Sequence, residues 1–425
     1  MVRKVLKSSK GSKGFEMKLS NLHPKTRMVV FDDDPTGIQT VHSCLLVTDW
    51  SDETIRKAMQ DEVPFFYVLT NTRALTPDVA CMTLTTALEA VIRVNREFGY
   101  RLICVSRSDS CLRGHFPLEP NVMREVLTQH GYKVWPKIPF APAFIESGRY
   151  TIDGTHYMVD GERLIPVSES EFARDNVFGY KNARLVDYIE EKGGNPKDYE
   201  IVNARSYEEL NAFRDTLFAA IEGEKCAVVI RSSSSLPRAL SGIADKPFLS
   251  SENLGIQTQG TGLFIVGSHV KKTTEQLSHL LDSEGVKGIE LPIEEILDNS
   301  DLLMSKTQEN IRNLFHQGIT PVVYTARKEV RIDDPAQRLR LGQTISDFLV
   351  AIVRQLSVCP SYLVAKGGIT SHDILTKGLS VKTTRVMGQV INSVPCVMTE
   401  RFPYIIFPGN VGGPRSLEEI YKVLK

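Results

Sequence analysis

The stretch RMVVFDDDPTG, residues 27–37, joins an apolar run directly to three aspartates. A continuous apolar run of this kind is typical of a strand that is buried on both faces of a parallel sheet. In open α/β sheets, ligands bind beyond the carboxyl ends of the strands, which is where these carboxylates fall. The residues Asp34 to Gly37 could alternatively form only a turn that an aspartate caps. Because three carboxylates follow one strand, we prefer a functional role for this segment.

Similar apolar runs recur along the chain and are separated by amphipathic stretches. Strands that alternate with helices predict α/β units with a largely parallel sheet. The clearest helices are expected within residues 51–62, 77–99 and 336–356. The expected strands are residues 27–31, 65–69, 101–106, 199–204, 226–231, 262–267, 288–292, 320–326, 362–366 and 404–407.

The chain length of 425 residues exceeds what one small core organises and indicates two domains. The segment 245–262 is polar, rich in Ser, Gly and Gln, and without periodicity, so we place the boundary there. The predicted organisation is a basic N-terminal tail (1–24), a first domain (25–247) and a second domain (258–425). We expect two α/β domains with mainly parallel sheets that face an active-site cleft.

The charge balance argues against nucleic acid and membrane as partners. Lys plus Arg and Asp plus Glu number 51 each, so no net field attracts DNA or anionic lipid. No apolar run approaches the length of a membrane span. The N-terminus lacks the apolar core of a secretory signal, and we interpret it as a frayed tail rather than an organelle-targeting peptide. The seven Cys include no CxxC pair, which favours reduced thiols and a cytoplasmic protein.

Two further strand ends carry arginines. Arg73 follows the run 65–69, and the segment SRSDSCLRGHF, residues 106–116, follows the run 101–106. An arginine fork suits a carboxylate, and Ser and Asp side chains suit hydroxyls, so these residues could hold a small polyhydroxy acid. An Arg–Asp structural pair with capping serines is an equally weighted alternative. The candidate residues of the segment are Arg107, Ser108, Asp109, Ser110 and Arg113.

The segment 142–164 alternates polar with apolar residues and contains Asp-Gly twice, which predicts a β-hairpin. His156 lies within it. A single histidine in such a pattern is more often a hydrogen-bonded structural residue than a catalyst. Nothing in the segment has the ligand spacing of a zinc site, and the ligands of any metal ion stay unassigned.

Three glycine-containing turns follow strands in the second half, at Gly267-Ser268, Gly367-Gly368 and Gly409 to Gly413. Glycine lets the backbone approach a phosphate group, and exposed amides at the start of a helix attract negative charge. Three such turns in one domain indicate a nucleotide site. The motifs GxxxxGK[ST] and GxGxxG are absent, which argues against a P-loop ATPase and a Rossmann dehydrogenase.

Taken together, these motifs resemble the four-carbon acid sugar kinase family, known earlier as a domain of unknown function. The resemblance extends from about residue 27 to the C-terminus. It differs from the family pattern at Arg107 and Phe407, where members carry lysine, and at Ile369, where they carry an acidic residue. The matching segments are Asp33 to Gly37, Arg107 to Gly114, PAFIESGRYTIDG (142–154), Ala173 to Phe178, Gly267-Ser268, Gly367 to Thr370 and Phe407 to Gly412.

The resemblance implies an ATP-dependent kinase that phosphorylates a hydroxyl of a tetronate-like or 3-oxo-tetronate acid, with Mg²⁺ bridging the phosphates. Its N-terminal domain would bind the acid and its C-terminal domain the ATP. The implied substrate residues are Asp33, Arg73, Arg107, Ser108, Asp109, Ser110, Arg113 and Gly114. The implied nucleotide residues are Ser268, Gly367, Gly368, Ile369, Thr370, Gly409, Asn410 and Gly412.

For the mechanism, we expect Asp33 or Asp34 to accept the proton of the hydroxyl group, with Asp109 in reserve. The carboxylate of the acid would bind Arg107 or Arg113, with Arg73 as a further candidate. Two alternatives stay open: another α/β enzyme that acts on small sugar acids, and a non-catalytic sensor that retained the cleft. A homodimer is compatible with the sequence but is not indicated by any particular segment.

Overall fold

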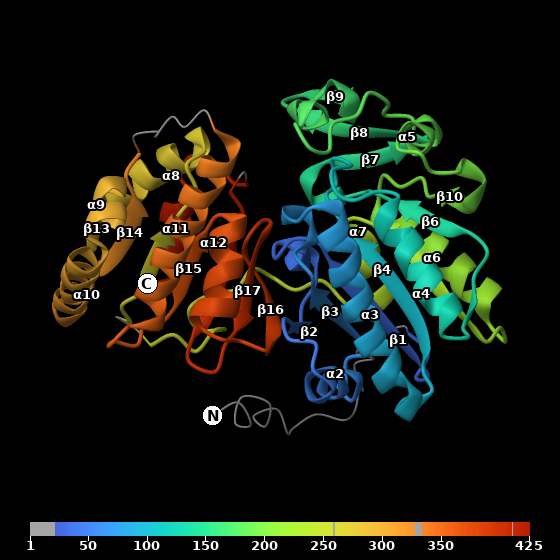
Figure 1. The fold of residues 1–425 in the computed structure, drawn as a ribbon, viewed down its shortest axis with the longest axis horizontal. Coiled ribbons are helices and arrows are strands. Elements are labelled where there is room, and N and C mark those ends of the chain that lie inside the picture. The colour runs from blue at the N-terminus through green and yellow to red at the C-terminus, as the bar shows by residue number, and fades with distance from the viewer. Residues whose placement is uncertain (1–21, 258–259, 328–333, 410) are drawn as a thin grey trace.

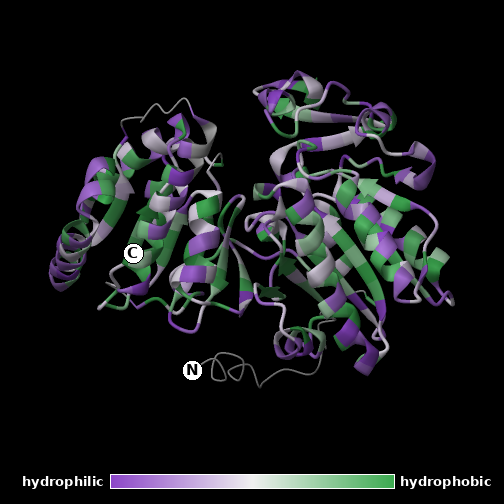
Figure 2. Cartoon of the chain, viewed as in Figure 1, coloured by the Kyte–Doolittle hydropathy of each residue, from purple (hydrophilic) through white to green (hydrophobic). Residues whose placement is uncertain are grey.

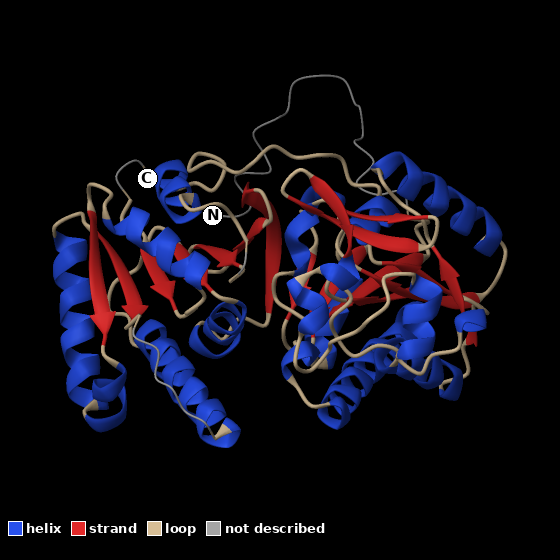
Figure 3. Cartoon of the chain, turned by 90° about the horizontal axis from the view of Figure 1, so that it is seen from above, coloured by secondary structure: helices blue, strands red, loops and turns tan. Residues whose placement is uncertain are grey.

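The computed structural model describes residues 22–257, 260–327, 334–409 and 411–425. Its main feature is one large, mostly parallel sheet with helices on both faces (Figures 1 and 3). The strand order is β10-β6-β11-β4-β1-β3-β2-β16-β17-β18-β15-β12-β14-β13, and β5 pairs with β11. This arrangement confirms the predicted α/β class.

The first half of the chain forms the lobe on the right of Figure 1. Its strands in the large sheet are β1 (Thr26–Asp32), β2 (Leu45–Val47), β3 (Phe65–Leu69), β4 (Arg101–Arg107), β5 (Lys133–Val134), β6 (Ile138–Ala141), β10 (Tyr199–Ile201) and β11 (Cys226–Ser232). Its α-helices are α2 (Asp52–Met59), α3 (Pro77–Phe98), α4 (Leu118–Gln129), α5 (Leu185–Glu191), α6 (Tyr207–Ile221) and α7 (Ser235–Ser241). Its 3-10 helices are η1 (Gly37–Thr40), η2 (Thr72–Ala74), η3 (Ile145–Ser147), η4 (Val167–Glu169), η5 (Glu171–Arg174) and η6 (Pro196–Asp198).

A small antiparallel sheet lies beside this lobe and confirms the predicted hairpin. It consists of β7 (Arg149–Ile152), β8 (Thr155–Asp160) and β9 (Arg163–Pro166). His156 is fully buried there, with its Nδ1 2.9 Å from Thr151 Oγ1 and its Nε2 2.8 Å from the Ser110 carbonyl. Both ring nitrogens are therefore occupied, as the structural interpretation of this histidine requires.

The second half forms the other lobe. Its strands are β12 (Leu263–Val266), β13 (Val286–Leu291), β14 (Thr320–Thr325), β15 (Leu363–Lys366), β16 (Thr383–Ile391), β17 (Val394–Met398) and β18 (Pro403–Phe407). Its helices are α8 (Lys271–Leu281), α9 (Ile293–Asp298), α10 (Ser300–His316), α11 (Pro335–Arg354), α12 (Gly368–Asp373), the π-helical turn η7 (Ile374–Gly378) and α13 (Ser416–Leu424). In both halves, every strand and helix expected from the sequence is present.

The packing follows from the alternation of side chains along each strand. In β1, Met28 and Val30 enter the core on one face of the sheet, and Val29 and Phe31 enter the core on the other face. The first of these cores extends into the second half of the chain, where it includes Ile265. Figure 2 shows hydrophobic strands beneath helices whose outer faces are hydrophilic.

The two halves are joined through their sheets, which the sequence analysis did not foresee. Strand β2 pairs antiparallel with β16, with Leu45 opposite Arg385 and Val47 opposite Thr383. Arg385 also binds both carboxylate oxygens of Asp61, at 2.8 and 2.6 Å. The strands expected to form two separate sheets therefore form one continuous sheet.

Among the described residues, no helix combines the length and the apolar character needed to cross a membrane.

Candidate active site

Within each half, the polar ends of neighbouring parallel strands lie side by side. Strands β4, β1 and β3 are neighbours, so the segments that follow them lie together, as predicted. Strands β18, β15 and β12 are also neighbours, which brings the three glycine turns together.

Asp32 and Arg107 form the buried layer. They lie opposite each other in the β1–β4 register, and Nη1 of Arg107 donates to Asp32 Oδ1 at 3.0 Å. The other carboxylate oxygen of Asp32 has no partner among the described residues, and Gly37 packs directly against this carboxylate. Burial raises the pKa of Asp32 to about 7. Arg107, which we expected to hold substrate, is itself buried and also binds the Ser234 hydroxyl, so it supports the site from below.

Asp33 forms the next layer and is fully engaged. Its carboxylate accepts hydrogen bonds from Arg73 Nε at 3.0 Å and Nη2 at 2.5 Å, and from the Ser108 hydroxyl at 2.5 Å. Only 1% of the Asp33 side chain is exposed. A Cβ atom on Gly114, whose φ is +120°, would lie 3.0 Å from Asp33 Oδ2 and still closer to the Ser108 hydroxyl. Glycine at 114 therefore permits the close approach of this loop, but the segment leaves little of Asp33 for a substrate.

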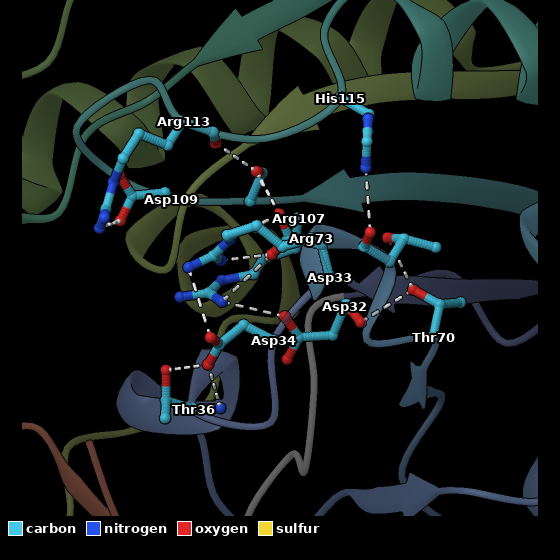
Figure 4. A network of polar contacts seen from close by, with 12 residues as sticks. Asp32, Asp33, Asp34, Thr36, Thr70, Arg73, Arg107, Asp109, Arg113 and His115 are labelled. Atoms are coloured by element: carbon cyan, nitrogen blue, oxygen red, sulfur yellow. Dashed lines mark hydrogen bonds and ion pairs between the residues drawn. The ribbon is translucent and has the colours of Figure 1, made fainter. Parts of the chain in front are cut away.

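Asp34 is the carboxylate of the three that stays accessible. Its side chain is 22% exposed, and it accepts hydrogen bonds from the Thr36 amide at 2.8 Å and from the Thr36 hydroxyl. Arg73 approaches it through Nη1 at 3.4 Å (Figure 4). Burial alone would raise the pKa of Asp34, but Arg73, Thr36 and Arg107 outweigh it and hold this pKa below its ordinary value. Asp34 is therefore a charged acceptor at physiological pH.

A separate ion pair joins Asp109 to Arg113 in the loop that follows β4. Arg113 donates to Asp109 through Nε at 2.9 Å and Nη2 at 3.2 Å, and its guanidinium lies 4.8 Å from the ring centre of Phe172. Burial alone would raise the pKa of Asp109, but Arg113 and Arg73 hold it well below its ordinary value. The Arg113 side chain is 21% exposed and that of Arg73 18%. Two partly exposed guanidinium groups thus remain to bind a carboxylate.

Sequence reasoning missed another buried ion pair, in which Arg231 lies 2.7 Å from Glu119. Glu119 also accepts hydrogen bonds from Thr72 at 2.6 Å and from Ser106 at 2.9 Å. The pair therefore ties the loop after β3 to the end of β4. Arg231 could have been noticed as a charged residue near the end of an apolar run, as Arg107 was.

The glycine turns of the second half lie close to one another. A Cβ atom on Gly367, whose φ is +119°, would be 3.3 Å from both the Ser268 Cβ and the Thr370 hydroxyl. A Cβ atom on Gly409 would be 3.4 Å from the Ser268 hydroxyl. These four predicted nucleotide residues are therefore brought together. Ile369 is exposed, Gly412 packs against Ser416, and Asn410 lies outside the described residues.

Lys366, at the end of β15, was not predicted as a site residue. It lies opposite Phe407 in the β15–β18 register, and its Nζ is 3.8 Å from the centre of that ring. The lysine that the family resemblance led us to expect at position 407 is thus absent, and a lysine of the neighbouring strand lies beside that position. A lysine that ends an apolar run directly before Gly-Gly is the sequence signal that could have found it.

The two groups of residues approach each other at Asp34 and Gly368. The carboxylate oxygen Oδ2 of Asp34 lies 3.7 Å from the position that a Cβ atom on Gly368 would occupy. His372 lies on the same face of helix α12 as Gly368, one turn later. Burial lowers the pKa of His372, and the negative charge of Asp34 acts in the opposite direction. The acidic loop of the first half therefore borders the glycine turn of the second.

The described residues contain no cluster of three His, Cys, Asp or Glu side chains that would hold a metal ion unaided. Mg²⁺ commonly binds through substrate phosphates and one or two carboxylates, and Asp34 is the accessible carboxylate beside the glycine turn. The residues present therefore fit a magnesium ion that arrives with a nucleotide.

Two family profiles match separate parts of the chain. A profile of a sugar-binding N-terminal domain matches residues 28–229, and a profile of a nucleotide-binding C-terminal domain matches residues 263–417. No curated protein matches the chain. The two profiles together span most of the sequence.

Solved structures show the same fold at low sequence identity. A Haemophilus influenzae protein from a domain-of-unknown-function family superposes with a TM-score of 0.65 at 15% identity, over 93% of this chain and 100% of that one. A Salmonella typhimurium LT2 protein, described provisionally as a tRNA synthase, gives a TM-score of 0.67 at 14% identity, over 92% and 98%. A Bordetella bronchiseptica protein, crystallised with citrate as a domain-swapped dimer, gives a TM-score of only 0.38 at 17% identity, over 93% and 98%, which is too low to inform on assembly.

Proposed function

We propose that this chain, which belongs to the four-carbon acid sugar kinase family, transfers the γ-phosphoryl group of ATP to a hydroxyl group of a small sugar acid. The observation that carries the proposal is the 3.7 Å approach of Asp34 to the Cβ position of Gly368. A charged acceptor from the sugar-binding half then stands beside the glycine turn of the nucleotide-binding half. We assign the acid to the domain of residues 25–247 and the nucleotide to that of residues 258–425.

In the proposed complex, Arg73 and Arg113 bind the carboxylate of the sugar acid, because both guanidinium groups are partly exposed and Arg107 is not. A planar guanidinium can donate two parallel hydrogen bonds to a carboxylate. Asp34 accepts a hydrogen bond from the reacting hydroxyl group. This set favours a four-carbon acid such as a tetronate or 3-oxo-tetronate over a neutral sugar.

The chemical step is an in-line displacement. The hydroxyl oxygen forms a bond to the γ-phosphorus, the bond from that phosphorus to the β–γ bridging oxygen breaks, and ADP leaves. The hydroxyl proton passes to Asp34. Because such transition states are loose, a carboxylate of low pKa suffices: it orients the hydroxyl and takes its proton as the new bond forms.

The nucleotide would lie against the turns at Ser268, Gly367-Gly368 and Gly409, where the backbone is open to phosphate groups. Magnesium, when bound, would neutralise charge on the β- and γ-phosphates. All seven cysteines are free, which supports our proposal that the enzyme acts in the cytoplasm.

The test is a coupled ADP-release assay with Mg-ATP and a panel of four-carbon acids: threonate, erythronate and their 2- and 3-oxo forms. Turnover with one member, absent without acid, is the expected result. If ATP and an acid each raise the melting temperature but no acid is turned over, the sensor alternative replaces the kinase. If neither ligand binds, the nucleotide assignment fails.

A further inference from the structure

Lys366 is a lysine whose side chain is entirely enclosed, with 0% exposed. Its Nζ donates to the carbonyl oxygen of Pro408 at 2.6 Å and of Gly409 at 3.3 Å, and it lies 3.8 Å from the ring centre of Phe407. An ammonium group has three donors. Two of them meet carbonyls, and the third can face the π electrons of the ring, so these contacts offset part of the cost of burying the charge.

These contacts fix the orientation of the peptide unit between Pro408 and Gly409. In a trans peptide, the C=O and N–H bonds point in opposite directions. Because Lys366 holds the Pro408 carbonyl, the amide N–H of Gly409 points away from Lys366. Within the described part of the chain, this amide donates to no backbone or side-chain acceptor.

A second contact ties this turn to its neighbour. The Thr273 hydroxyl lies 3.0 Å from the Ser268 hydroxyl and 3.3 Å from the carbonyl oxygen of Gly409. The position of the Gly409 turn is therefore fixed from two sides, by Lys366 and by Thr273. Only Lys366 brings a charge.

We propose that Lys366 is a positioning residue for nucleotide binding, whose ammonium group turns the Gly409 amide outward to meet a phosphate oxygen. The inference rests on the proposed function and assigns a role to a residue that would not itself touch the nucleotide. The lysine acts from beneath the turn, through the two carbonyls that it holds.

The surroundings of Lys366 give the proposal a pH signature. Burial, and to a smaller extent the positive charge of Lys272 on α8, lower the pKa of Lys366 to about 7. A bound phosphate favours the protonated form, so nucleotide binding should take up protons. Affinity should then fall as pH rises through about 7 to 9, because the amine loses the proton that binding requires.

The experiment measures Mg-ADP binding to the full chain by isothermal titration calorimetry, with the variants Lys366→Met and Val364→Ala. Methionine has a similar volume but no charge: it removes the cost of an enclosed ammonium group and leaves the Pro408 carbonyl without this donor, so the two effects on stability oppose each other. Val364 is a buried residue two positions earlier on β15 and controls for general loosening of the strand.

We expect Lys366→Met to weaken Mg-ADP binding by about 10-fold or more, as for the loss of one charge-assisted hydrogen bond. Its melting temperature should change little, acid binding should be unchanged, and its affinity should vary less with pH than that of the wild type. Val364→Ala should lower the melting temperature and keep the wild-type affinity.

Equal Mg-ADP affinity and equal pH dependence in Lys366→Met and the wild type would overturn the inference. Because the wild type would still bind Mg-ADP in that case, the proposed function would stay intact. If the wild type binds no nucleotide, the proposed function fails first. Should Lys366→Met not fold, titration of the wild type in two buffers of different ionisation enthalpy measures proton uptake directly, and an uptake of zero around pH 8 contradicts the role.

Discussion

Arg73 binds Asp33 through two nitrogens, at 3.0 and 2.5 Å, but reaches Asp34 through only one, at 3.4 Å. One guanidinium group therefore neutralises a buried carboxylate and borders an accessible one. Because of this difference, we assign different roles to the two neighbouring aspartates, which the sequence alone does not distinguish. Asp33 anchors the loop, and Asp34 is placed to meet a ligand.

Replacement of Asp34 by Asn should remove the proton acceptor while leaving the buried network in place. We expect kcat to fall by about 100-fold or more, with little change in the melting temperature or in acid binding. Steady-state kinetics with Mg-ATP and thermal unfolding measure both. Wild-type kcat in Asp34→Asn would remove the base assignment.

Asp33→Asn is the matched variant, and its predicted effect is on stability. It removes the charge that Arg73 binds through two nitrogens and leaves Arg73, which is 18% exposed, with the longer contact to Asp34 at 3.4 Å. This should cost about 1–3 kcal/mol of the free energy of unfolding. Chemical denaturation measures this loss. An Asp33→Asn protein as stable as the wild type would contradict the anchoring role.

Two adjacent glycines should respond differently to alanine. Gly367 has a φ of +119°, which an alanine adopts only with strain, and its Cβ would press on Ser268 and Thr370 at 3.3 Å. We expect Gly367→Ala to lose about 1–2 kcal/mol of stability and to bind Mg-ADP more weakly. Gly368→Ala should fold normally, because its Cβ would meet Asp34 at 3.7 Å, an ordinary contact distance. Thermal shift and calorimetry compare the two variants.

His156 predicts loss of stability in acid. Burial lowers its pKa to about 4, so between that value and the ordinary pKa near 6.5 the unfolded chain binds the extra proton. Stability is therefore full above about pH 6.5 and falls as pH decreases toward 4, by about 2 kcal/mol between pH 7 and pH 5. Urea denaturation across this range should show the fall, and His156→Gln, which does not titrate, should show a correspondingly smaller one. Identical pH dependence in both would exclude this histidine as the cause.

The continuous sheet predicts that the two halves unfold together. Strands β2 and β16 are hydrogen-bonded, and one hydrophobic core contains residues of both halves. Differential scanning calorimetry should therefore give a single transition rather than one for each domain. Two resolved transitions would show that the pairing across the junction contributes little to cooperativity.

Much of this architecture was predictable because its signal is local. Buried parallel strands such as β1 and β3 are continuous apolar runs, and the polar residues at their carboxyl ends are visible in the sequence. Asp34, Arg73 and the glycine turns could therefore be proposed as site residues from the sequence. Strand β16 was not predicted, because its buried and partly exposed residues alternate and its pairing with β2 depends on residues far away in the chain. Strand β17, a short apolar run that pairs with β16, was not predicted either.

The roles of individual site residues were harder to predict than their positions. Arg107 and Arg113 stand in one short motif, yet one is buried against Asp32 and the other is partly exposed. That difference arises from the alternation of the strand and from the loop that follows it. Lys366 escaped notice for a related reason, since its partners Pro408 and Gly409 come from another strand.

The pairing of β2 with β16 also has a consequence for the two halves taken separately. If the chain were divided between the two domains and the parts were produced as independent polypeptides, each part would present an unprotected sheet edge that the other now covers. Such edges pair readily with foreign strands and promote aggregation. We therefore expect each half, produced alone, to aggregate more readily than the whole chain.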